Sequence, residues 1–136
     1  MDLNELENQV NLLQYHLQLL ANCIDSDEHP VESLILNMNW NEKQIDRAHD
    51  IFQKYDQLID SKSKIVWSKF EHELRDEFAI GYQTVKAIVI AFYKNHQWVD
   101  VCYQYAMSFE PTTPIEFHQI TRNNKFKHSL NDLYKK

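Results

Sequence analysis

The sequence predicts an all-α protein, a multihelical bundle of about six helices. Only 1 glycine and 3 prolines occur among its 136 residues, while 43% of the residues are hydrophobic. Sandwiches and barrels of β-strands need many tight turns, which glycine and proline supply, so these fold classes are disfavoured. Apolar residues instead recur at intervals of three and four positions, the spacing that places them on one face of a helix.

The first predicted helix, from about residue 3 to residue 23, carries a heptad pattern of apolar residues. Such a pattern is typical of a helix that packs along another helix. The seam consists of Leu3, Leu6, Val10, Leu13, Leu17, Leu20 and Ile24. Leu12 and Leu19 form a second patch, about 100° further around the helix. We therefore expect two packing partners, the body of its own subunit and a second copy in a homo-dimer or homo-trimer; the alternative is an ordinary amphipathic helix on a monomer.

Two further helices follow an acidic link at residues 25–28. Pro30 suits the first position of a short helix over residues 30–38, because proline there loses only an N–H that has no partner. Asn41 and Gln44 form a capping-box pattern that starts a third helix.

Three more helices complete the predicted bundle. Ser68 and Glu71 form a second capping-box pattern, which opens the fourth helix. Gly81 is expected to end that helix in the left-handed conformation. The fifth helix, residues 83–94, is apolar nearly all round and is predicted to be the most buried. The sixth covers about residues 97–109.

Residues 3–109 resemble, in pattern and spacing, the YhaI-like family of small helical proteins of low-GC Gram-positive bacteria, a family of unknown function. The likeness comprises the seam from Leu12 to Leu20, and the acidic residue, proline and short apolar helix over residues 27–38. It continues in the turn into a helix at residues 67–70 and in the closing helices over 84–93 and 97–109. The resemblance implies a multihelical domain that assembles as a homo-oligomer. It implies no activity, cofactor or functional residue.

An acidic body and a basic tail divide the sequence near residue 110. Residues 1–110 hold 18 acidic and 9 basic residues, a net charge of −9, whereas residues 111–136 hold 2 and 5, a net charge of +3. We expect a helical domain over 1–110 and a C-terminal appendage over 111–136 that is weakly helical or disordered, either docked on the acidic body or mobile. The expected tail contacts are Phe117, Ile120, Arg122, Lys125, Phe126 and Lys127.

No catalytic, cofactor-binding or metal-binding residue is predicted. His72-Glu73 lacks the second histidine that a zincin motif requires. Asp46-x-x-His49 lacks the second such pair of a di-iron site and is expected to be solvated on the polar side of its helix. A single glycine also leaves no glycine-rich loop for phosphate.

Cellular context is predicted from what the sequence lacks. No apolar run approaches the roughly 20 residues of a membrane span, and residues 1–8 carry acids where a signal peptide carries bases. Cys23 and Cys102 lie on apolar helical patterns, so we expect buried, reduced thiols in the cytoplasm.

The favoured functional hypothesis is a non-enzymatic, cytoplasmic homo-oligomer that acts through protein–protein contacts, as a small regulator or adaptor with an unidentified protein partner. One alternative is a DNA-associated transcriptional regulator that uses the basic tail, although the acidic body opposes binding to nucleic acid. Another is a protein that binds a small apolar ligand among its aromatic residues.

Overall fold

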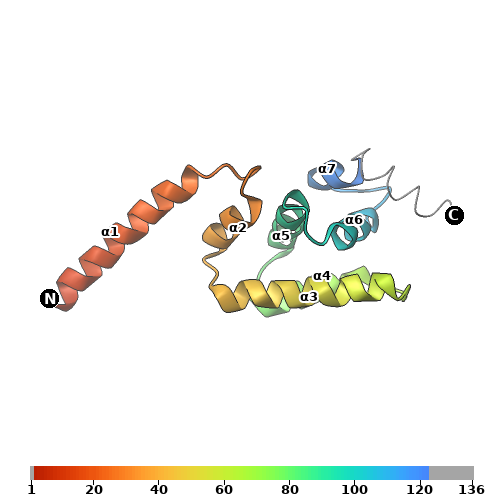
Figure 1. Ribbon diagram of the computed structural model, residues 1–136, viewed down its shortest axis with the longest axis horizontal. Helices are drawn as coiled ribbons and strands as arrows, with labels where there is room; N and C mark the ends of the chain where they lie inside the picture. Colours follow the sequence, from red (N-terminus) through yellow and green to blue (C-terminus); the bar gives the residue numbers. More distant parts are fainter. Residues whose placement is uncertain (1, 123–136) are drawn as a thin grey trace.

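The computed structural model describes residues 2–122 and contains helices and no strands in that part of the chain (Figure 1). The predicted all-α, multihelical fold is confirmed. None of the helices in this range combines the length and the apolar composition that a membrane crossing requires. The elements are α1 (Leu3–Asn22), α2 (Pro30–Met38), α3 (Glu42–Asp60), α4 (Trp67–Phe78), α5 (Tyr82–Lys94), α6 (Val99–Met107), the 3₁₀ turn η1 (Ile115–Phe117) and α7 (His118–Thr121).

Helices α2 to α7 enclose one hydrophobic core around α5. Contacts link α5 to α2, α4, α6 and η1. The ring of Phe92 in α5 packs edge-on against that of Phe52 in α3, with centroids 4.7 Å apart. As predicted from its apolar surface, α5 is the most buried helix, with six buried residues: Val85, Lys86, Ile88, Val89, Ala91 and Phe92.

Local sequence signals place the first residues of α2 and α3. Pro30 is the first residue of α2. The side chain of Asn41 accepts a hydrogen bond from the Gln44 N–H at 3.0 Å, and the side chain of Gln44 accepts one from the Asn41 N–H at 2.8 Å. The predicted capping box of α3 is confirmed.

Both predicted ends of α4 are wrong. The helix begins one residue before Ser68, and no side chain caps its described N-terminus. At its other end Ala79, rather than Gly81, is left-handed, with φ of 50°. The Ile80 N–H bonds to the Arg75 carbonyl at 3.2 Å, and Ile80 packs against the core. This apolar contact just after the helix offsets the strain at Ala79, while Gly81 is extended and precedes α5.

Residues 111–122 pack into the same core as α5 and α6. Phe117 and Ile120 are completely buried. The Phe117 ring lies 5.7 Å from that of Tyr105 and 5.8 Å from that of Phe109, between ring centroids. The described part of the predicted appendage is therefore docked, one of the two expected alternatives, and its apolar residues complete the core beside α6.

Candidate functional site

Helix α1 exposes its whole apolar surface. Within Leu3–Asn22 no residue is buried. Nine of the twelve large apolar side chains that are exposed among the described residues lie on this helix. Figure 1 shows α1 as a rod that projects away from the other helices. The seam residues within the helix are 44% to 82% exposed: Leu3, Leu6, Val10, Leu13, Leu17 and Leu20.

Local interactions favour a helix here without help from the body. The Asp2 side chain caps the N-terminus and accepts a hydrogen bond from the Glu5 N–H at 2.8 Å. Glu5, in the first turn, also interacts favourably with the helix dipole. The helix holds neither proline nor glycine. A solitary helix of this length is nevertheless only marginally stable in water, since most helical stability comes from packing an apolar face.

The link after α1 is fixed to the body and directs the helix outward. Lys94 of α5 donates a hydrogen bond from Nζ to Oδ1 of Asp27 at 2.8 Å. The Asp27 N–H in turn bonds to Oδ1 of Asp25 at 2.9 Å. Ile24, the last seam residue, is half-buried at this junction. The root of α1 is therefore held while the rest of the helix extends into solvent.

A second apolar stripe follows the seam along α1. Leu12 and Leu19 are 54% and 47% exposed. The expectation that one face of α1 packs on the body of its own subunit is wrong, because the link directs the helix away from that body (Figure 1). Sequence reasoning missed Tyr15, which is also exposed and lies three residues after Leu12 and four before Leu19. That spacing is the signal that could have revealed it.

The two thiols differ in accessibility. Neither forms a disulfide in the described chain. Cys102 is buried, its Sγ lies 3.4 Å from the Val89 carbonyl oxygen, and burial raises the pKa of its thiol. Cys23 is exposed, contrary to expectation, because the end of α1 on which it lies is not covered by the body.

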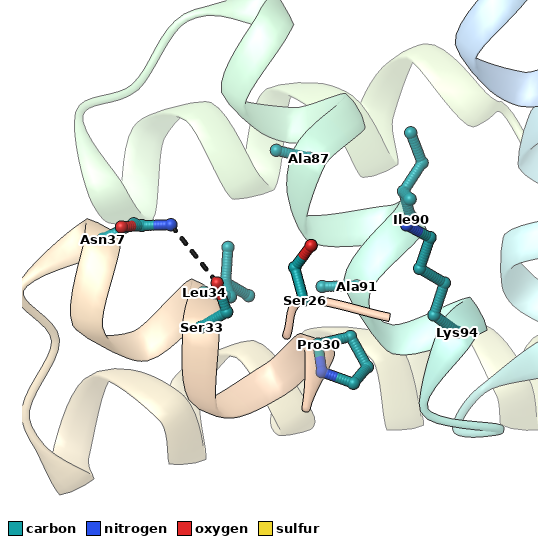
Figure 2. Close-up of a pocket in the computed structure, with 9 residues that line it drawn as sticks. All are labelled: Ser26, Pro30, Ser33, Leu34, Asn37, Ala87, Ile90, Ala91 and Lys94. Atoms are coloured by element: carbon teal, nitrogen blue, oxygen red, sulfur yellow. Dashed lines mark hydrogen bonds between the residues drawn. The ribbon is translucent and has the colours of Figure 1, made fainter. Parts of the chain in front are cut away.

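A shallow groove between α2 and α5 is a second candidate site, with a volume of about 280 Å³. Figure 2 shows Leu34 and Ser33 on the α2 side and Ala87 and Ala91 on the α5 side. Its one ionisable lining residue, Lys94, already bonds to Asp27. The groove therefore offers no pair of side chains for acid–base chemistry. The lining residues are Ser26, Pro30, Ser33, Leu34, Asn37, Ala87, Ile90, Ala91 and Lys94.

A second recess, of about 340 Å³, lies between α4 and α6. At its wall the Tyr105 hydroxyl donates a hydrogen bond to Oε2 of Glu71 at 3.0 Å. Burial, together with the charge of Glu71, raises the pKa of Tyr105. The phenol therefore stays protonated at neutral pH, which fits a structural hydrogen bond better than a catalytic base.

Metal-ligating residues do not gather in residues 2–122. No group of three or more His, Cys, Asp or Glu side chains there could hold a metal ion. The expectation of a solvated Asp46–His49 pair is wrong for His49, whose ring packs 5.5 Å from that of Phe92 and 6.2 Å from that of Trp98. Nε2 of His49 is buried without a hydrogen-bond partner among the described residues.

The predicted tail contacts fall into three groups. Phe117 and Ile120 belong to the core, whereas Arg122 is exposed. The remaining three lie outside the described residues: Lys125, Phe126 and Lys127.

Comparison of the chain with protein-family models, with curated proteins and with solved structures found no match. The basis for a functional inference is therefore the exposed surface of α1.

Proposed function

We propose that this chain is a non-enzymatic, cytoplasmic homo-oligomer that self-associates through α1 and acts through protein–protein contacts, as a small regulator or adaptor. The supporting observation is the exposed heptad seam, since monomeric soluble proteins rarely expose a contiguous apolar patch of this kind. The resemblance to the YhaI-like family belongs to the same proposal, because it implies the same mode of assembly.

The energetics favour association through the seam. The six seam residues within α1, five leucines and Val10, are 44% to 82% exposed. Burying the exposed part of one such side chain in the helix pair contributes about 1 kcal/mol to the free energy of association, roughly half the value for burying a complete side chain. Six such residues on each of two helices give a total comparable to the roughly 4–15 kcal/mol that association costs. Where association costs about 4 kcal/mol, the lower end of that range, the roughly 12 kcal/mol gained leaves about 8 kcal/mol, which corresponds to a dissociation constant in the micromolar range.

Two other hypotheses have narrower support. A DNA-associated regulator would use the basic tail, of which Arg122 is described and exposed; a salt-dependent shift of duplex DNA would favour it. A protein for a small apolar ligand would use the groove between α2 and α5, and native mass spectrometry of freshly purified protein would detect the bound compound.

The test of self-association is the double variant Leu13→Glu with Leu17→Glu. The double substitution would place two carboxylates of each chain in the buried seam, so we expect the dissociation constant to rise at least about a hundredfold, the equivalent of about 2.7 kcal/mol. Light scattering after size-exclusion chromatography measures the mass directly. The body should stay folded, because these side chains are exposed in the single chain.

The matched control is Asn11→Glu with Gln18→Glu. It adds two carboxylates to exposed positions of α1 that lie outside the seam, and it should keep the mass of the wild type. Equal masses for the seam variant and the wild type would show that α1 is not the association surface.

A further inference from the structure

We propose that α1 pairs with α1 of a second copy in antiparallel orientation, which makes the protein a dimer with its two bodies at opposite ends of the helix pair. This inference rests on the proposed function. It is carried by the heptad register and by the position of the acidic residues on α1.

The seam fits an antiparallel pair along its whole length. Leu3, Val10 and Leu17 occupy a positions, and the leucines that alternate with them occupy d positions. In an antiparallel pair, each a residue packs in one layer with a d residue of the other helix. One register, centred between residues 11 and 12, covers all six exposed seam residues. Its layers join Leu3 with Leu20, Leu6 with Leu17, and Val10 with Leu13.

A parallel pair would bring like charges together. In that arrangement a g residue faces the e residue of the next heptad on the other helix. Asp2 at g would therefore face Glu7 at e of the second copy. This contact would occur twice in a dimer and three times in a trimer. The hydrogen bond from the Glu5 N–H holds the Asp2 carboxylate at the helix end. Residues 1–24 contain no lysine or arginine that could compensate.

The antiparallel pair avoids this contact. In this orientation the e residues of one helix face the e residues of the other, and g residues face g residues. Glu7 and Gln14 both occupy e positions, so Glu7 lies beside Gln14 of the second copy. Gln9 likewise lies beside His16. Amide groups can donate to a carboxylate or bond to an imidazole. These two kinds of flanking pair are therefore polar and free of like charges.

Two of the three acidic side chains of the link, those of Asp25 and Asp27, make contacts within their own chain. The N-terminus of one α1 comes close to the link of the second copy, which contains Asp25 and Asp27. The carboxylate of Asp27 is paired with Lys94 at 2.8 Å, and that of Asp25 accepts the Asp27 N–H. The charge of Asp27 is thus neutralised within its own chain, and the carboxylate of Asp25 is directed into its own loop.

Native Cys23 supplies the test. It is the exposed thiol, whereas Cys102 is buried, so a nitroxide reagent labels Cys23 of the full-length chain. In the antiparallel register the two Cys23 residues are 23 positions apart along the axis, about 35 Å at a rise of 1.5 Å per residue. A second variant carries the label at Gln9→Cys in a Cys23→Ser background. Its two labels, one on each chain, should lie within about 15 Å of each other, because they are offset by only about 7.5 Å along the axis and the two helices are adjacent.

Electron–electron dipolar spectroscopy distinguishes the outcomes. A long distance at Cys23 with a short one at position 9 is the expected result. Short distances at both sites would overturn the antiparallel orientation and indicate a parallel pair. Long distances at both would overturn the α1 contact. Absence of any dipolar coupling, together with a monomeric mass, would overturn the proposed self-association itself.

Discussion

Helices α1 and α5 both have strongly apolar surfaces, but only α5 is covered by its own chain. Six residues of α5 are buried among α2, α4, α6 and η1. No residue of α1 is buried within Leu3–Asn22. This difference in burial comes from the segments that connect the helices. Short turns fold neighbouring helices around α5, whereas the link that Lys94 fixes to the body leaves α1 pointing outward. Apolar surface that one chain cannot cover is available to a second chain.

The largest effect is expected from Phe92→Ala in α5. This residue is completely buried and packs against Phe52, so the substitution should lower the free energy of unfolding by about 3–5 kcal/mol. Urea denaturation measures the loss. The folded fraction should keep the wild-type mass, because α1 is unchanged. A loss below about 1 kcal/mol would contradict the central position of α5.

A somewhat smaller effect is expected from Ile120→Ala in α7. Ile120 is completely buried, and removing its side chain should lower the free energy of unfolding by about 2–5 kcal/mol. Ile115→Ala is the matched control, because Ile115 in the same segment is 81% exposed. Equal stabilities for the two variants would mean that residues 111–122 do not share the core of α5.

The sequence predicted most of the fold because its signals are local. Pro30 and the Asn41 capping box set the first residues of two helices, and their effect depends on a few neighbouring backbone groups. The end of α4 was predicted wrongly because it depends on a tertiary contact, the packing of Ile80 against the core. The sequence indicated Phe117 as a contact of a docked tail but left a mobile tail as the alternative, because the packing of its ring against Tyr105 is also a tertiary contact.

The candidate site was predicted only in part. The spacing of Leu13 and Leu17 indicates a helix that requires a partner, and the structure shows these residues exposed. The period alone does not identify what covers a second patch such as Leu12 and Leu19. That depends on the direction of the link, which is set by the distant contact between Asp27 and Lys94.

The smallest effect is expected from Asp56→Asn in α3, beside the body's acidic side chains. Burial, followed by the charges of Asp60 and Asp100, raises the pKa of Asp56 in the folded state. Above that pKa the carboxylate is ionised and lowers the free energy of unfolding. Below the unfolded value of about 3.9 the group is protonated in both states and has no such effect. The variant should gain up to about 0.5 kcal/mol at pH 7 and nothing at pH 3.

Thermal unfolding at both pH values checks this prediction, with Asp50→Asn, exposed on the same helix, as the control. A larger gain in stability at pH 3 than at pH 7 would contradict the predicted direction of the pKa shift of Asp56. Because Asp56 lies on the body, the oligomeric mass should not change, in contrast to a substitution in the α1 seam.

Sedimentation velocity of the wild-type protein over a range of concentrations tests the role of α1 most directly. The chain has a mass of 16.4 kDa, and the antiparallel pair predicts a species of twice that mass that dissociates on dilution. A single species of 16.4 kDa at every concentration up to tens of micromolar would contradict association through α1.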